Sequence, residues 1–260
     1  MKSEDDGLIS LQHMLSFLKR GIPVVACEKL ALANYRKYLR KYLRILGINA
    51  TVGGGSGFPS IIENFSFINE VCLVANTTMS FIFAEVAKGL PVSQALERAV
   101  EMQLSEKGKD DLFDVCRGEI FDNLSKAVNI GNLITGKCVR LSDQKVSLFT
   151  REHLDELLKD PSMVRLSFVV CKRRHIPGQG FCHFGRSHFR VGDMEVIAGF
   201  KRYDHKHPMA RPTLPMGVRN RMIVWRELDG TEVNCLFEGD GAGPEPTAGM
   251  MIGDANMLLQ

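Results

Sequence analysis

Long apolar runs are missing from this sequence, and their absence excludes a protein that spans a membrane. The longest runs, at 71–75 and 167–171, are far shorter than the roughly 20 apolar residues of a membrane-spanning helix. The segment 1–21 is acidic and then amphipathic, without the apolar core of a secretory signal. We therefore predict a cytoplasmic protein with no membrane partner.

Paired cysteine motifs are also lacking. The seven cysteines are an odd number, lie far apart and include no C-x-x-C pair. This usage is typical of reduced thiols that are buried as small apolar side chains. The sequence therefore argues against a disulfide framework.

Common catalytic and nucleotide-binding motifs are absent as well. The chain has no G-x-S-x-G, no H-E-x-x-H and no G-x-x-x-x-G-K-[ST]. It also has no G-x-G-x-x-G followed about twenty residues later by an acid. The glycine-rich run at 53–57 follows a predicted strand, and we interpret it as a flexible turn rather than a phosphate site. The sequence therefore favours a non-catalytic binding or regulatory protein.

A strongly basic stretch, residues 163–226, is the most unusual feature that the sequence does contain. Its thirteen Lys and Arg residues outnumber its three acids, which gives +10, whereas the whole chain carries only +3. Five of the seven histidines lie in the same stretch. This asymmetry indicates an anionic partner for the second half of the chain.

Aromatic side chains alternate with cations inside this stretch, in a pattern typical of nucleic-acid binding. Arginine pairs bidentately with phosphate, and aromatic rings stack on exposed bases. We predict that the basic half engages a phosphate-bearing ligand, nucleic acid first. The predicted phosphate-contacting and stacking residues are Lys172, Arg173, Arg174, Phe181, Phe184, Arg186 and Arg190.

The same stretch offers a second interpretation, a zinc-stabilised module. Four possible ligands, Cys171, His175, Cys182 and His188, are spaced C-x3-H-x6-C-x5-H. Four N/S ligands suit a tetrahedral structural zinc site, although this spacing matches no standard zinc finger. The alternative is a buried cysteine beside surface histidines. Apart from this zinc, the sequence predicts no cofactor.

Hydrophobic periodicity predicts a mixed α+β fold with two domains and a tail. An α/β domain over 1–136 begins with a βαβ unit, a basic β-rich domain covers 137–238, and a flexible tail covers 239–260. Short β-branched and aromatic runs in the second domain predict a small antiparallel, barrel-like sheet. The turn at 227–230 predicts a hairpin.

The βαβ unit contains a long helix, predicted over 29–46, with a basic stripe on one side. Its cations are Arg36, Lys37, Arg40, Lys41 and Arg44. A solvated helix face is one interpretation of this stripe. Contact with an acidic partner or a phosphate backbone is the other.

The run DDLFDVCRGEIFDNLSKAVNIGNLITG resembles a helix of the chemotaxis phosphatase family. In that family a Glu and an Asn one helical turn apart orient the attacking water. Glu119 and Asn123 are the matching residues, with spacing E-x-x-x-N where the family has E-x-x-N.

The strand at 22–27 and its helix are also similar to a response-regulator receiver, with Glu28 in place of an acidic cluster and Asn76 near the phosphoacceptor position. These resemblances imply, as an alternative, a signalling adaptor. Such an adaptor would act through an acidic protein partner or a cyclic dinucleotide, although no PilZ motif is found.

Overall fold

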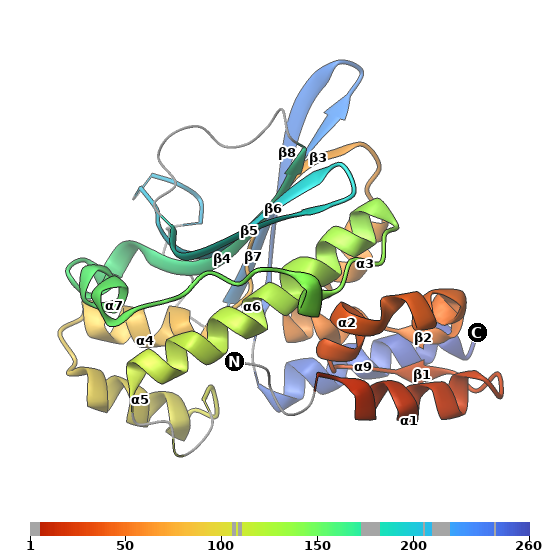
Figure 1. Ribbon diagram of the computed structural model, residues 1–260, viewed down its shortest axis with the longest axis horizontal. Coiled ribbons are helices and arrows are strands. Elements are labelled where there is room, and N and C mark those ends of the chain that lie inside the picture. Colours follow the sequence, from red (N-terminus) through yellow and green to blue (C-terminus); the bar gives the residue numbers. More distant parts are fainter. Residues whose placement is uncertain are drawn as a thin grey trace.

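A six-stranded antiparallel sheet forms the centre of the computed structural model, which describes residues 6–105, 108, 111–172, 183–204, 206–209, 219–241 and 243–260 (Figure 1). The strand order is β5-β6-β4-β3-β7-β8. The strands are β3 (Ile68–Val74), β4 (Val164–Lys172), β5 (His183–Val191), β6 (Met194–Arg202), β7 (Arg219–Leu228) and β8 (Thr231–Asp240). Strands β5 and β8 are its two edges and do not pair with each other, so the barrel-like closure predicted from the sequence is wrong.

Strand β3 comes from the first half of the chain but lies between β4 and β7. Its residue Val71 pairs with Val170 on one side and with Val224 on the other. The central position explains why β3 is almost entirely buried. The sheet therefore crosses the sequence boundary expected at Gly136, and the two-domain division stays a prediction.

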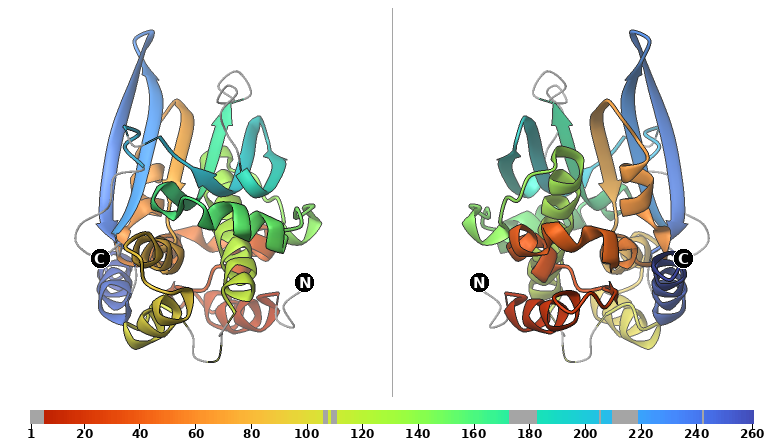
Figure 2. Two further views of the ribbon diagram at one scale, coloured as in Figure 1. Left: turned by 90° about the vertical axis from the view of Figure 1, so that its left-hand side faces the viewer. Right: turned by 90° about the vertical axis from the view of Figure 1, so that its right-hand side faces the viewer.

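Helices cover one face of this sheet (Figure 2). The long helix α6 (Leu112–Thr135) crosses β4, β5 and β6, and α4 (Thr77–Ala87) packs against β4 beside it. Their apolar side chains form one core cluster with the facing strand residues. The other helices that contribute to this core are α3 (Phe58–Glu63), α5 (Val92–Glu101) and α7 (Arg151–Leu158). Burial of these apolar faces is the main stabilising contribution.

The opposite face of the sheet holds a smaller apolar cluster with a polar centre. The Tyr203 hydroxyl is buried there and donates a hydrogen bond of 2.9 Å to Ser167 Oγ. Met209, which follows β6, packs into the same cluster. Both faces of β4 and β6 are therefore buried.

The predicted βαβ unit is present at the amino-terminal side. Strands β1 (Val24–Val25) and β2 (Leu46–Gly47) pair in parallel, with α1 (Leu8–Leu18) before them and α2 (Leu30–Leu39) between them. The predicted long helix is divided, because residues Arg40–Ile45 form a 3-10 helix, η1, after α2. Within the predicted basic stripe, Arg36 is buried rather than solvated.

The glycine-rich run 53–57 is a close-packed turn. It contains the 3-10 turn η3 (Gly54–Ser56), which follows η2 (Asn49–Thr51). A Cβ on Gly55 would lie 2.5 Å from a side-chain atom of Pro246, and one on Gly54 would lie 2.8 Å from the carbonyl oxygen of Gly241. The glycines therefore let other segments approach the turn closely, rather than leaving its amides open to a ligand.

The segment predicted to be a flexible tail contains helix α9 (Pro244–Leu258). The buried Asp254 carboxylate accepts a hydrogen bond of 2.9 Å from the backbone N–H of Asn49, and a second from the Asn49 side chain. This contact attaches α9 to the βαβ unit. Two further 3-10 turns are η4 (Leu141–Asp143) and η5 (Pro161–Met163). Over the described residues, no helix has the length and apolar character that crossing a membrane requires.

Candidate functional site

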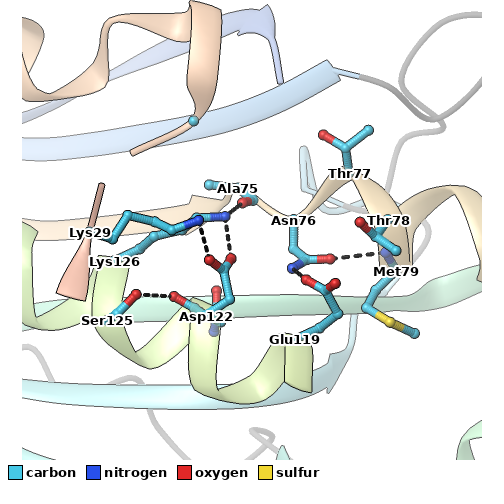
Figure 3. A network of polar contacts seen from close by, with 12 residues as sticks. Lys29, Ala75, Asn76, Thr77, Thr78, Met79, Glu119, Asp122, Ser125 and Lys126 are labelled. Atoms are coloured by element: carbon cyan, nitrogen blue, oxygen red, sulfur yellow. Dashed lines mark hydrogen bonds and ion pairs between the residues drawn. The ribbon is translucent and has the colours of Figure 1, made fainter. Parts of the chain in front are cut away.

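A cavity of about 450 Å³ lies where the amino-terminal ends of α2 and α4 meet the middle of α6. Figure 3 shows the polar side chains that gather there. Residues from five segments line the cavity: Lys29, Ala75, Asn76, Thr77, Thr78, Gln103, Leu104, Ser105, Gly118, Glu119, Asp122, Lys126 and Gly241.

Helix α6 supplies three of the charged side chains. Glu119, Asp122 and Lys126 follow one another at intervals of three and four residues, which places them on one side of the helix. This side faces the end of β3 rather than solvent, so Lys126 is buried. Lys126 Nζ donates a hydrogen bond of 2.5 Å to the carbonyl oxygen of Ala75, just beyond β3.

Asp122 is held between two lysines. Its Oδ1 lies 2.5 Å from Lys29 Nζ, and its Oδ2 lies 2.6 Å from Lys126 Nζ. Burial by itself disfavours the charged carboxylate, but attraction and hydrogen bonding from the two ammonium groups outweigh it and lower the pKa of Asp122 to about 2. Asp122 is therefore ionised at neutral pH, and the three side chains together carry one positive charge.

Lys29 stands between β1 and α2, and its main chain is fixed from two sides. The Glu28 carboxylate accepts hydrogen bonds of 2.6 Å from the N–H groups of Leu30 and Ala31, which caps the start of α2. The Asn129 side chain of α6 donates to the Lys29 carbonyl at 3.1 Å. Burial lowers the pKa of Lys29, but attraction to Asp122 and its hydrogen bond raise it overall. Lys29 therefore keeps its proton and acts as a cation.

Asn76 connects the start of α4 to α6. Its side-chain oxygen caps α4 by accepting from the N–H of Met79 at 2.9 Å, and its Nδ2 donates to Glu119 Oε2 at 2.6 Å. Thr77 and Thr78, the first residues of α4, also line the cavity. The first N–H groups of a helix are good partners for an anion. The cavity thus has a carboxylate, Glu119, and a helix start on one wall, and the lysine–aspartate cluster on another.

The described residues among those predicted to bind nucleic acid do not line this cavity. Lys172 Nζ donates to Asn69 Oδ1 at 3.0 Å, and Arg190 Nε pairs with Glu195 at 3.0 Å, both on the sheet. Phe184 packs against the core, 5.8 Å from the His153 ring, rather than standing free for stacking. Arg186 is exposed on β5, and the remaining three, Arg173, Arg174 and Phe181, lie outside the described residues.

Two of the four predicted zinc ligands, Cys171 and His188, lie in the described part of the chain. Cys171 is fully buried on β4, and His188 Nε2 lies 2.9 Å from Glu195 Oε2. His175 and Cys182 lie outside the described residues. Within the part of the chain that the structure describes, no group of three or more His, Cys, Asp and Glu side chains could hold a metal. The zinc site stays a prediction.

The chemotaxis phosphatase resemblance suggested Glu119 and Asn123 as a pair. Their side chains lie in different environments. Glu119 lines the cavity, whereas Asn123 is fully buried and donates to the carbonyl of Ser167 on β4 at 3.0 Å. The partner of Glu119 is Asn76, from another element. The two residues therefore do not orient one water together.

Sequence reasoning missed Lys29, Asp122 and Lys126. A pattern that points to two of them is present, because Asp122 and Lys126 interrupt the side of α6 that otherwise carries its buried residues. Charged side chains on a buried helix face are uncommon unless they form ion pairs or belong to a functional site. Lys29 has no comparable pattern, since only the fold brings it to α6.

Solved structures of dehydrogenases share this fold. The homoserine dehydrogenase of Thermoplasma acidophilum matches 100% of this chain and 73% of its own length, with 18% identity and a TM-score of 0.73. A hyperthermophilic archaeal homoserine dehydrogenase, solved with NADPH, matches 100% and 70% at 18% identity and a TM-score of 0.65. The S. aureus homoserine dehydrogenase matches 96% and 55% at 20% identity and a TM-score of 0.62.

The sequence model of the family described as homoserine dehydrogenase matches residues 62–255, which is most of the chain. No curated protein sequence matches this chain. The chain belongs to the homoserine dehydrogenase family.

Family membership corrects the functional predictions. The nucleic-acid partner and the signalling adaptor are both wrong, because the family is one of dehydrogenases. The positive charge of residues 163–226 misled the interpretation. Glu195 pairs with His188 and Arg190, and Arg202 lies 3.7 Å from Glu156, so acids neutralise part of this charge on the protein itself.

Proposed function

We propose that the cavity at Lys29, Asp122 and Lys126 is the substrate site of a homoserine dehydrogenase-type oxidoreductase. The reaction class is the reversible oxidation of an amino-acid alcohol to its aldehyde. NADP⁺ would accept the hydride and become NADPH, the form that two solved structures of relatives carry. The observation that supports the proposal is the buried lysine–aspartate–lysine cluster in a cavity enclosed largely by residues of the family match.

The charges of the cavity suit a zwitterionic amino acid. Glu119 offers a carboxylate to the ammonium group of the substrate, while the N–H groups at the start of α4 offer donors to its carboxylate. The alcohol oxygen would then lie toward Lys29 and Lys126. Placement of the charged ends would hold the reacting carbon in one position.

The two lysines would stabilise the oxygen while its charge changes. In the reducing direction the aldehyde oxygen becomes negative, and a protonated Lys29 can donate its proton to that oxygen. Asp122 keeps Lys29 protonated and fixes both ammonium groups through its two oxygens. Asp122 is therefore a positioning residue, and Lys29 is the proposed acid.

The glycine-rich run 53–57 does not supply a cradle for the pyrophosphate of a dinucleotide. The glycine-rich run is packed against Gly241 and Pro246, and a Cβ on Gly53 would meet the Phe58 ring at 2.8 Å. The chain also has no G-x-G-x-x-G. We therefore assign no step to the cofactor and base the proposal on the substrate and its proton.

Calorimetric titration of the full chain with L-homoserine tests the proposal. We expect saturable binding that weakens by at least about tenfold in Lys126→Met, because this change removes a buried charge beside the substrate. The exposed Lys145 gives a matched control, Lys145→Met, which should bind like the unaltered chain. Equal affinity in the two variants, or no binding to the unaltered chain, would contradict the proposed site.

A second assay addresses the reaction. The chain is mixed with L-homoserine and NADP⁺, and formation of NADPH is followed by its absorbance. We expect NADPH formation that Lys29→Met abolishes. Formation of NADPH at an unchanged rate in Lys29→Met would remove Lys29 from the mechanism.

A further inference from the structure

A second cavity, of about 560 Å³, lies between α1 and the carboxyl-terminal end of α2 with η1. Seven residues line it, and four of them are cations: Lys19, Lys37, Arg40 and Lys41. No carboxylate lines this cavity among the residues that the structure describes. The proposed reaction makes no use of this basic cavity.

No described carboxylate pairs with any of the four cations. None of them forms an ion pair with any other described residue. All four residues are exposed. The cavity cations Lys37, Arg40 and Lys41 lie close together at the end of α2 and the start of η1, and like charges at short range repel. An anion bound in the cavity would offset this repulsion.

The rest of the lining suits a compact ligand. Tyr38, Tyr42 and Leu15 also line the cavity, and tyrosine hydroxyl groups can donate hydrogen bonds. Lys41 Nζ lies 4.8 Å from the centre of the Tyr42 ring, which holds that ammonium group at the cavity. Three lysines and one arginine present separate point charges, which suits several anionic groups better than one planar carboxylate.

We propose that this basic cavity binds a small polyanion, a compound with two or more carboxylate or phosphate groups on a compact body. The site is distinct from the substrate site. The two cavities have no lining residue in common, and Lys29 and Arg40 flank opposite ends of α2, which is about 15 Å long at 1.5 Å per residue. The inference does not depend on the proposed dehydrogenase reaction.

Calorimetric titration of the full chain with pyrophosphate and with tricarballylate tests this site. We expect both to bind at least tenfold more tightly than inorganic phosphate or acetate, because only polyanions engage several cations at once. Unequal binding of the two probes identifies which chemistry the cavity prefers. Equal affinity for monoanions and polyanions would overturn the proposal.

Charge-matched variants locate the binding. The double substitution Lys37→Gln with Lys41→Gln should weaken pyrophosphate binding by at least tenfold. The control, Lys137→Gln with Lys145→Gln, removes the same charge from exposed lysines outside the cavity and should leave binding within twofold. Equal losses in the two double variants would show general charge attraction and would refute the site.

The lysines of the substrate site need their own control, since they too attract anions. Lys126→Met should leave pyrophosphate binding unchanged if the anion occupies the basic cavity. Loss of pyrophosphate binding in Lys126→Met, with retention in the Lys37 and Lys41 double variant, would move the anion to the substrate site and overturn the proposal. Failure of homoserine binding does not affect this result.

Discussion

Asp122 and Glu195 are both carboxylates held between two basic side chains, yet their surroundings differ. The partners of Asp122 are Lys29, from the start of α2, and Lys126, from the next turn of α6. The partners of Glu195 are His188 and Arg190, from the adjacent strand β5. One group joins elements that are distant in the sequence, whereas the other joins two strands of one hairpin.

The two groups also differ in exposure. The Arg190 side chain is 56% exposed and that of His188 is 42% exposed, so water screens the contacts of both with Glu195. Lys126 is only 11% exposed, and Lys126 and Asp122 both line the cavity proposed as the substrate site. The comparison teaches that a functional site is indicated by buried charges that meet at a cavity, and not by the number of charges in a stretch of sequence.

The largest expected effect comes from Lys126→Met. It leaves Asp122 with one cation and removes a charge beside the substrate, so kcat/KM for homoserine oxidation should fall by about 100-fold or more. Initial rates of NADPH formation measure this effect. Arg190→Met removes one cation from the Glu195 group and should leave kcat/KM nearly unchanged. Equal losses of kcat/KM in Lys126→Met and Arg190→Met would contradict the distinction between the Asp122 and Glu195 ion pairs.

The second largest expected effect is that of acid on the stability contributed by the ion pairs of Asp122. The pKa of Asp122 is about 2 in the folded chain, against 3.8 for an ordinary Asp. Its stabilisation is therefore complete above about pH 4 and is lost as the pH falls toward 2, which is worth about 2 kcal/mol. Urea unfolding of the unaltered chain and of Asp122→Asn across this range measures it. Their difference in unfolding free energy should shrink with acid, and a constant difference would contradict the lowered pKa.

Asn76→Ala should have a smaller effect on stability. It removes the cap of α4 and the hydrogen bond to Glu119, at a cost of about 1 kcal/mol in unfolding free energy. Asn76→Ser retains a capping oxygen and should recover part of this loss. Chemical denaturation provides the measurement. No difference between the Ala and Ser variants would show that the cap contributes little.

The smallest effect is expected for Arg190→Met on stability. An ion pair with a largely exposed arginine contributes below about 1 kcal/mol, and raised salt should diminish it further. Denaturation at low and high salt measures both values. A loss of unfolding free energy in Arg190→Met as large as that in Lys126→Met would mean that the contacts of Glu195, and not only those of Asp122, contribute strongly to the stability of the fold.

Much of the fold was predictable because it follows local patterns. The parallel pairing of β1 with β2 follows the strand-helix-strand order, and the turn at Asp229 and Gly230 forms the predicted hairpin between β7 and β8. The sequence alone leaves segment 78–88 open between a strand and a buried helix, because the segment is largely apolar. The Asn76 cap and burial against β4 and α6 decide for helix α4.

The site was less predictable, for a physical reason. Glu119 stands out in the sequence, but its hydrogen-bond partner, Asn76, is brought to it by the packing of α4 on α6. In the same way, the basic stretch 163–226 attracts attention by composition, although acids on neighbouring strands and helices neutralise part of it.

The sequence by itself determined most of the periodic elements, and the family model matches on sequence alone, since both depend on residue type and spacing along the chain. Only the tertiary structure decided that the sheet is open, that β3 lies at its centre and that Lys29 meets Asp122. Charges interact through space, and the free energy of an ion pair depends on burial and distance. Neither quantity is written in the order of the residues.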